Sequence, residues 1–268
     1  MARLDTEALV LRVVDFGESD RIAHLLTPGT SRLTVIAKGA RRSRRRFPGV
    51  LDLLCHVAVQ VERRRPQGMA RLEQARLLDP GAALRADPAR FALACYVAEL
   101  VDRLAPEGAG GAEARHLFEA ALGALQAIAA GRPDARLRVL LEVRLLRALG
   151  LAPELGRCVR CARALAPGAP VLFHVAEGGA LCAACARAGD AAVPVGLGTL
   201  RALEQSLRLG LPELSRLGLS GAALAEARGL LARFLRFHVG LELRSEPVLD
   251  RLLPRPPGAG SAPVARAP

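Results

Sequence analysis

Two pairs of cysteines have the spacing of a structural metal site. Each pair follows the pattern Cys-x-x-Cys, and twenty residues separate Cys158 and Cys161 from Cys182 and Cys185. Each pair offers two thiolates, and two pairs complete a tetrahedron around zinc with Zn–S distances of ~2.3 Å. Because four thiolates fill the coordination sphere, no position remains for an activated water. We therefore predict a structural zinc site.

The same four cysteines are also compatible with two disulfides, with a site that has lost its metal, or with an iron–sulfur cluster. Cytosolic disulfides are rare, and the opening residues do not read as a secretory signal, because Asp5, Glu7 and Asp15 interrupt the apolar stretch. Zinc coordinated by the four cysteines is therefore the favoured interpretation. We interpret Cys55 and Cys95, on apolar faces of predicted elements, as ordinary buried thiols.

A short segment after a predicted strand concentrates positive charge. It has no acid, and its six basic side chains in nine positions are Lys38, Arg41, Arg42, Arg44, Arg45 and Arg46. A basic loop at the edge of a barrel attracts nucleic-acid phosphates without reading bases. The alternative is a solvated basic loop, which we favour for the isolated arginine triplet at 63–65 but not for the longer run.

Aromatic side chains are scarce near this basic segment. They make up 3% of the chain, and residues 1–80 contain only Phe16 and Phe47. An extended stacking platform for single-stranded nucleic acid cannot be built from two rings, so we expect binding to be mainly electrostatic and sensitive to salt. Phe47 follows the basic segment, and we expect it to anchor the loop in the core rather than to stack on a base.

The overall charge indicates a polyanionic partner. The chain has 38 basic and 26 acidic side chains, a net charge of +12, and Lys38 is its only lysine. We attribute the preference for arginine over lysine to a GC-rich genome. No uncharged apolar stretch of 18 residues is present, so we predict no membrane-spanning helix and a soluble, cytoplasmic protein.

Motifs of catalysis are missing from the sequence. It has no phosphate-binding loop, dinucleotide fingerprint, serine-hydrolase elbow or zinc-protease motif, so we predict that the protein is not an enzyme. The carboxylates Asp15, Glu18 and Asp20 are better explained by a solvated turn or a salt bridge to Arg21 than by a metal. The alternatives to a non-enzymatic DNA-binding protein are a zinc-dependent nuclease or deaminase and a zinc-ribbon regulatory factor.

The basic segment belongs to a region with the pattern of short strands. Residues 55–62 alternate, with Val57, Val59 and Val61 on one face, and Leu9, Leu11 and Val13 alternate similarly. Further strands are predicted at 21–27, 32–37 and 69–78. Five short strands within residues 1–80 favour a small closed barrel, of which the OB-fold is the commonest five-stranded type.

The pattern changes to helices after residue 80. Asp87 and Pro88 predict a helix start, followed by an apolar stripe from Phe91 to Leu104. Further helices are predicted at 112–130, 133–149, 198–209 and 222–242. The fold class is thus α+β and multidomain: an OB-fold DNA-binding domain (1–80), a helical domain (81–253) with an inserted four-cysteine zinc module (156–190), and a disordered tail (254–268).

Several segments together resemble the RecO family of bacterial recombination mediators. They are EALVL at 7–11, GESDR at 17–21, LTVIAKGARR at 33–42, LLEVRLLRALG at 140–150 and LAPELGRCVRC at 151–161. The resemblance covers the chain to about residue 250. It implies an OB-fold joined to a helical domain with an embedded zinc module. It also places the family's basic-loop positions at Lys38, Arg41 and Arg42, with Arg44, Arg45 and Arg46 as an extension.

The resemblance further implies a role in recombinational repair through the RecFOR pathway. Members of the family bind single- and double-stranded DNA, anneal complementary strands and work with RecR. They engage the single-stranded DNA-binding protein and help RecA to load onto coated strands. We therefore expect these partners for this chain.

Overall fold

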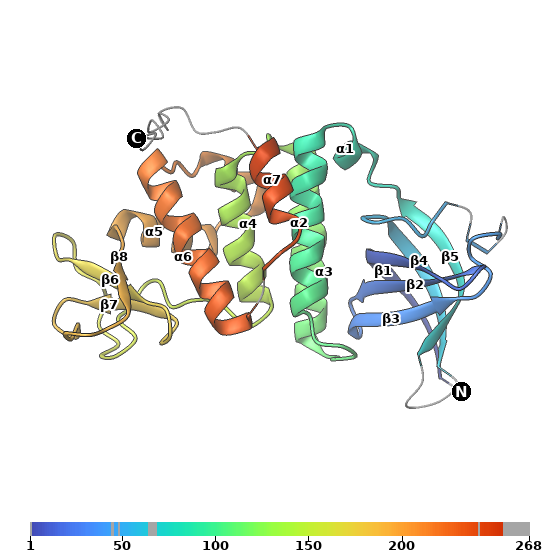
Figure 1. Ribbon diagram of the computed structural model, residues 1–268, viewed down its shortest axis with the longest axis horizontal. Coiled ribbons are helices and arrows are strands. Elements are labelled where there is room, and N and C mark those ends of the chain that lie inside the picture. Colours follow the sequence, from blue (N-terminus) through green and yellow to red (C-terminus); the bar gives the residue numbers. More distant parts are fainter. Residues whose placement is uncertain (1, 44–45, 48, 64–68, 241, 254–268) are drawn as a thin grey trace, which may run out of the picture.

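The protein has three parts in a row, as its computed structural model shows (Figure 1). A five-stranded barrel lies at one end, helices fill the middle, and a sheet of three short strands lies at the other end. The structure describes residues 2–43, 46–47, 49–63, 69–240 and 242–253. The predicted tail at 254–268 lies outside the described residues.

Five strands close the barrel in the order β1-β2-β3-β5-β4. They are β1 (Ala2–Phe16), β2 (Asp20–Thr27), β3 (Ser31–Ala37), β4 (His56–Arg63) and β5 (Ala70–Asp79). β3 and β5 are parallel and the other neighbours are antiparallel. This arrangement fits an OB-fold and confirms the predicted fold class. Val57, Val59 and Val61 fill the barrel interior, as the alternation on β4 predicts.

A β-bulge breaks the alternation on β1. The register with β2 shifts between Val10 and Arg12. Leu9 before the bulge and Leu11 within it pack on the helices, whereas Val13 after it packs against the barrel core. The prediction that Leu9, Leu11 and Val13 share one face was therefore wrong, because the extra residue of a bulge reverses the faces of the strand beyond it.

Five longer helices follow the barrel, close to the predicted positions. They are α2 (Pro88–Leu104), α3 (Ala112–Ala130), α4 (Ala135–Ala148), α5 (Leu197–Ser206) and α6 (Gly221–Val239). The Asp87 carboxylate accepts the backbone N–H of Arg90 at 2.8 Å and caps α2. α6 ends before the predicted residue 242 because Gly240 takes a left-handed conformation, with φ of 65°.

The apolar stripe predicted on α2 was partly wrong. Phe91 is 36% exposed, whereas Leu93, Tyr96, Val97 and Leu100 are buried. α2 contacts β1 and the helices α3, α4 and α7 (Glu246–Leu252), so most of its circumference is covered rather than a single stripe. No helix among the described residues is long and apolar enough to cross a membrane.

Short elements escaped the sequence analysis. Besides α7 they are α1 (Ala82–Arg85), the 3₁₀ helix η1 (Leu211–Arg216), β6 (Val171–His174), β7 (Gly179–Cys182) and β8 (Ala192–Pro194). Such elements span too few residues to show a hydrophobic period. The three strands form a sheet in the order β7-β6-β8.

The buried apolar side chains form two cores. One fills the barrel. The other runs from Leu9 and Leu11 on the outside of β1, through the helices, to Phe173 on β6 and Leu181 on β7. The helices are therefore the body against which both the barrel and the small sheet are packed.

Polar contacts fix the barrel to the helices at Asp102 of α2. Its buried carboxylate lies 2.6 Å from His24 Nδ1 and 3.8 Å from an Arg32 nitrogen. Glu107, just beyond α2, accepts the backbone N–H of Thr34 at 2.8 Å and pairs with Arg32 at 3.1 Å. These contacts set the angle between β2, β3 and α2.

A buried arginine ties the C-terminal helix to the bundle. Arg138 of α4 is 4% exposed, and its guanidinium pairs with Glu246 and, at 2.6 Å, with Asp250. It also lies 4.7 Å from the centroid of the Tyr96 ring and 3.9 Å from Glu142. Burial raises the pKa of Glu142 to about 7 against the attraction of Arg138.

We expect Arg138→Ala to lower the free energy of unfolding by ~3–5 kcal/mol, since the change leaves the buried Glu142 without a cation and removes the ion pairs that hold α7. The matched control is Arg228→Ala, which removes a partly exposed arginine from the same Asp250 and should cost less than ~1 kcal/mol. Urea unfolding of both variants measures the difference. Equal losses would show that Arg138 acts as a surface charge.

Candidate metal centre and nucleic-acid interface

The four predicted metal ligands come together at the edge of the small sheet. Their Sγ atoms all lie within 4.8 Å of one another, and this is the one such cluster among the described residues. The backbone N–H of Val159 donates to Ala180 O at 2.9 Å, which holds the first pair beside β7. Cys182 is the last residue of β7, and Cys185 follows in a turn closed by its own N–H on Cys182 O at 3.0 Å.

The spacing of the sulfurs fits tetrahedral coordination. Cys161 Sγ and Cys182 Sγ are 3.9 Å apart, and all six cysteines of the chain are free. A tetrahedron with metal–sulfur bonds of ~2.3 Å has edges of ~3.8 Å. The four sulfurs therefore surround a volume that suits one metal ion and are too far apart for disulfides.

The local backbone helps one thiol to ionise but not all four. Burial opposes ionisation of Cys158, yet the backbone N–H groups of Cys182, Cys161 and Arg160 lower its pKa to about 6. Hydrogen bonding with the Cys161 and Cys182 sulfurs raises the pKa of Cys185 to about 12. Four thiolates at this distance repel one another, so a cation between them is needed to hold all four in the ionised form.

Arg160 lies within the first cysteine pair and connects it to the second. Its guanidinium donates to Glu177 at 2.6 Å, to Asp190 at 2.8 Å and to the backbone carbonyl of Cys185 at 2.7 Å. The hydrogen bond from Arg160 lowers the pKa of Asp190 to about 2. Since Arg160 is paired with two carboxylates, its charge is already matched. His174 accepts the backbone N–H of Glu177 and lies outside the sulfur cluster.

The second candidate site is the basic loop, which starts where β3 ends. Lys38 Nζ lies 2.6 Å from Asp20, and the same carboxylate accepts the backbone N–H of Gly39 at 2.8 Å. These two contacts lower the pKa of Asp20 to about 2. Arg41 donates to the Glu18 carbonyl at 3.2 Å and pairs with Asp15 at 3.5 Å.

The far end of the loop is fixed to the barrel. Arg46 donates to Lys38 O at 2.7 Å, and its own carbonyl accepts the N–H of Ala75 on β5 at 3.2 Å. Phe47 is 5% exposed and belongs to the barrel core, as expected. The Arg46 guanidinium lies 5.2 Å from the centroid of its ring. The loop is therefore anchored at both ends.

The basic side chains of the loop differ in whether they already have a carboxylate partner. Arg42 is exposed, and its guanidinium makes no ion pair or hydrogen bond with another described residue. Arg44 and Arg45 lie outside the described residues, as do Arg64 and Arg65 of the second basic cluster. Lys38 and Arg41 remain partly exposed while paired with carboxylates. Arg42 is thus the described basic side chain of the loop that is most available to a polyanion.

For Asp15, Glu18 and Asp20, the sequence favours a solvated turn or a salt bridge to Arg21 over a metal. The salt bridge is present, because Asp15 pairs with Arg21 at 3.1 Å, whereas Asp20 holds the start of the basic loop. The partner of Asp20 is eighteen positions away in the sequence. The spacing of residues gave no signal for this contact.

Two family models together match most of the chain. The description "Recombination protein O N terminal" covers residues 1–80, and "Recombination protein O C terminal" covers residues 85–247. The chain belongs to the RecO family.

Curated relatives agree with this assignment to the RecO family. The DNA repair protein RecO of Anaeromyxobacter dehalogenans strain 2CP-C is 39% identical over 254 residues, which are 95% of this chain and 98% of the relative. RecO of Myxococcus xanthus is 38% identical over 248 residues, 91% of this chain and 96% of the relative. RecO of Syntrophus aciditrophicus is 32% identical over 249 residues, which are 92% of this chain and 95% of the relative. Family membership supports a role in recombination and DNA repair.

We expect Asp20→Ala to loosen the start of the basic loop, because it removes the acceptor for Lys38 and for the N–H of Gly39. Hydrogen exchange followed by mass spectrometry should show faster exchange in peptides that cover residues 38–43. The matched control is Asp5→Ala, which removes an exposed carboxylate paired only with Arg3. Unchanged exchange at 38–43 would mean that Arg41 and Arg46 hold the loop without Asp20.

Proposed function

We propose that this RecO family member is a non-enzymatic, DNA-binding recombination mediator of the RecFOR pathway. It binds single- and double-stranded DNA, anneals complementary strands and, with RecR, promotes RecA loading on coated single strands. The observation that carries the proposal is the basic loop, which is anchored at both ends on an OB-type barrel and presents Arg42 to solvent.

The mechanism rests on neutralisation of phosphate charge. Residues 1–80 carry 15 basic and 9 acidic side chains, so this part has a net charge of +6. Arginines that contact phosphates release condensed counterions, which drives binding without base recognition. Two complementary strands bound to such surfaces repel each other less, so they meet more often. This step needs proximity and charge and no catalytic side chain.

The proposed protein partners follow from the family. They are RecR, the single-stranded DNA-binding protein and the RecA recombinase, and we assign their docking to the helical part of the chain. We also propose the division into a DNA-binding domain at 1–80 and a helical domain at 81–253, with a zinc module at 156–190. The family models at 1–80 and 85–247 support the first boundary. The working location is the bacterial cytoplasm at the nucleoid.

The proposed function is tested by annealing of fluorescently labelled complementary strands coated with the cognate single-stranded DNA-binding protein. We expect the chain to accelerate annealing and Arg42→Glu to slow it severalfold, because the change replaces a phosphate contact with a repulsive charge. The slope of log affinity against log salt should also fall by ~0.7–0.9 for the lost contact.

The matched control is Arg236→Glu, which reverses another exposed arginine, on α6 in the helical part. It should leave annealing and the salt slope near those of the unchanged protein. A chain that fails to accelerate annealing even at low salt would contradict the mediator function. Cleavage of the DNA in the presence of a divalent metal would indicate an enzyme instead.

We further propose that the metal ion of the cysteine cluster is zinc. The support is the donor set: four sulfurs at tetrahedral spacing favour zinc over the hard cations that prefer oxygen. Cys158, Cys161, Cys182 and Cys185 would hold the ion. With four thiolate ligands it would stabilise the junction of the two cysteine pairs and leave no position for substrate.

We expect one zinc per chain in elemental analysis of the purified protein. Cys161→Ser should lose that metal and raise the sensitivity of the module around residues 156–190 to proteolysis, since metal binding and local folding are coupled. Cys95→Ser is the control, because Cys95 lies on α2 away from the cluster, and it should keep one equivalent. An iron content or a visible absorption band would indicate an iron–sulfur cluster instead.

A further inference from the structure

The two aromatic side chains of residues 1–80 have opposite environments. Phe47 lies in the barrel core, whereas Phe16 is 51% exposed at the end of β1. A half-exposed phenyl ring at the end of a strand gains little from burial. It does offer a π-face to a ligand, and bases of nucleic acids stack on such rings.

The β-bulge on β1 directs a row of side chains to the same outer face. Arg12, Val14 and Phe16 are all exposed, while Val13 points to the barrel core. Opposite them on β2 lie His24, Ile22 and Asp20, in that order. Bulges often occur next to binding sites, where they re-aim side chains, and this bulge turns Arg12, Val14 and Phe16 outward. It aligns a cation, an aliphatic group and an aromatic ring.

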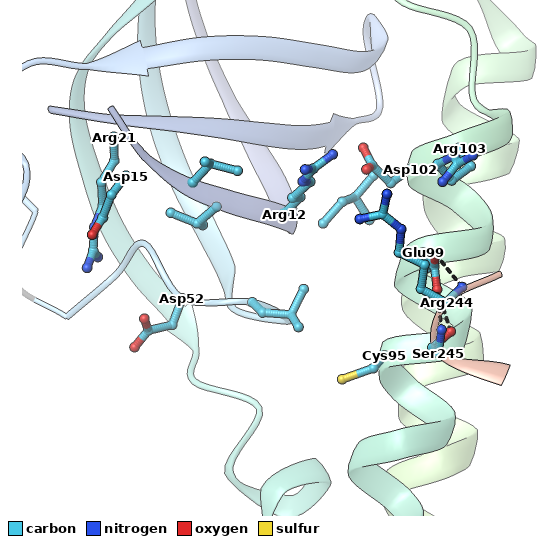
Figure 2. Close-up of a pocket in the computed structure, with 14 residues that line it drawn as sticks. Arg12, Asp15, Arg21, Asp52, Cys95, Glu99, Asp102, Arg103, Arg244 and Ser245 are labelled. Carbon is cyan, nitrogen blue, oxygen red and sulfur yellow. Dashed lines mark hydrogen bonds and ion pairs between the residues drawn. The ribbon is translucent and has the colours of Figure 1, made fainter. Parts of the chain in front are cut away.

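This row leads into a cleft between the barrel and the helices (Figure 2). The cleft has a volume of about 840 Å³ and is lined by β1, by α2 and by the segment before α7. Arg12 lies on the barrel side, and Arg103 and Arg244 lie on the helical side. The guanidinium groups of these three exposed arginines form no ion pair with any described residue.

The carboxylates of the cleft are mostly engaged elsewhere. Asp15 pairs with Arg21 and Arg41, and Asp102 with His24 and Arg32. Glu99 accepts the backbone N–H groups of Arg244 and Ser245 at 2.9 and 2.8 Å. Burial opposes ionisation of Glu99, but these hydrogen bonds and the charge of Arg103 lower its pKa, so it stays a carboxylate. Glu99 and Asp52 are the two carboxylates of the cleft that form no ion pair with a described residue. Three unpaired arginines therefore face two unpaired carboxylates.

The row is continuous with the basic loop. Arg41 donates to the carbonyl of Glu18, two residues after Phe16, and its backbone N–H donates to Ser19 O at 3.0 Å. The phenyl ring thus stands between the loop on one side and the cleft arginines on the other. Single-stranded nucleic acid, whose bases are free to stack, fits this order of basic loop, aromatic ring and arginines. A duplex fits it less well, because its bases are paired.

We propose that Phe16 is a base-stacking residue, and that a single strand of DNA passes from the basic loop over Phe16 into the cleft, where Arg12, Arg103 and Arg244 contact its phosphates. This inference rests on the proposed DNA-binding function and adds a path and a strand preference to it. The exposed ring supplies one stacking contact in a region that is otherwise poor in aromatics.

The chain contains no tryptophan, so Phe16→Trp introduces a single fluorescent reporter at the proposed contact. We expect (dT)15 to quench this fluorescence as the strand binds, and a duplex of equal length to leave it largely unchanged. The matched control is Phe237→Trp, at a side chain on α6 that is 60% exposed. Its fluorescence should not respond to the oligonucleotide.

A second measurement uses the anisotropy of a labelled (dT)15 strand. Phe16→Ala should weaken binding by about 5- to 150-fold, the range expected for one base stacked on an aromatic ring, and should leave the salt slope unchanged. Arg103→Ala should instead lower that slope by ~0.7. Circular dichroism verifies that the variants are folded.

Two negative results are distinguishable. If the unchanged protein binds the strand but Trp at position 16 is not quenched and Phe16→Ala binds normally, the path over Phe16 is wrong and the proposed function stands. If the unchanged protein does not bind single-stranded DNA at low salt, the proposed function and this inference both fail.

Discussion

One buried carboxylate, that of Asp102, sets the position of the barrel relative to the helices. It is 4% exposed and is shared by His24 on β2 and Arg32 on β3, two neighbouring strands of the barrel. A buried charge is tolerated only where such partners surround it, and removal of both partners would leave it uncompensated. The contact therefore fixes an angle as well as an attachment. The cleft beside it depends on that angle, since its two walls belong to the two parts that Asp102 joins.

Arginine serves this fold in ways that lysine could not. Arg136 donates to the backbone carbonyls of Leu214, Ser215 and Leu217 and so closes the end of η1. Arg138 pairs with two carboxylates of α7, and Arg160 bridges Glu177 and Asp190 from separate segments. A planar group with five donors satisfies several acceptors at once, whereas an ammonium is a point charge. Arginine supplies 37 of the 38 basic side chains of this protein, and these contacts show how the frequent residue is used.

The sequence predicted what depends on local pattern. Alternation on β4 and the cap at Asp87 placed strands and helices nearly correctly, and the spacing of cysteines placed four sulfurs together. It missed what depends on distant contacts or on backbone irregularity. The bulge at Val10 has no residue that marks it, and the ion pair of Lys38 with Asp20 forms only once β2 and β3 are paired. The exposure of Phe16 beyond the bulge likewise had no signal in the sequence, whereas the burial of Phe47 was predicted.

The double anchoring of the basic loop has a consequence for the energetics of recognition. A free loop loses conformational entropy when a ligand orders it, and that loss of about 1–2 kcal/mol per residue opposes binding. Here Asp20 holds Lys38 and Gly39, and Ala75 holds Arg46, so the ends of the loop are ordered during folding. The loop is preorganised at these points. Lys38 and Arg46 would therefore meet a strand already in place, and the free energy of folding, rather than that of binding, offsets the entropy lost at these two positions.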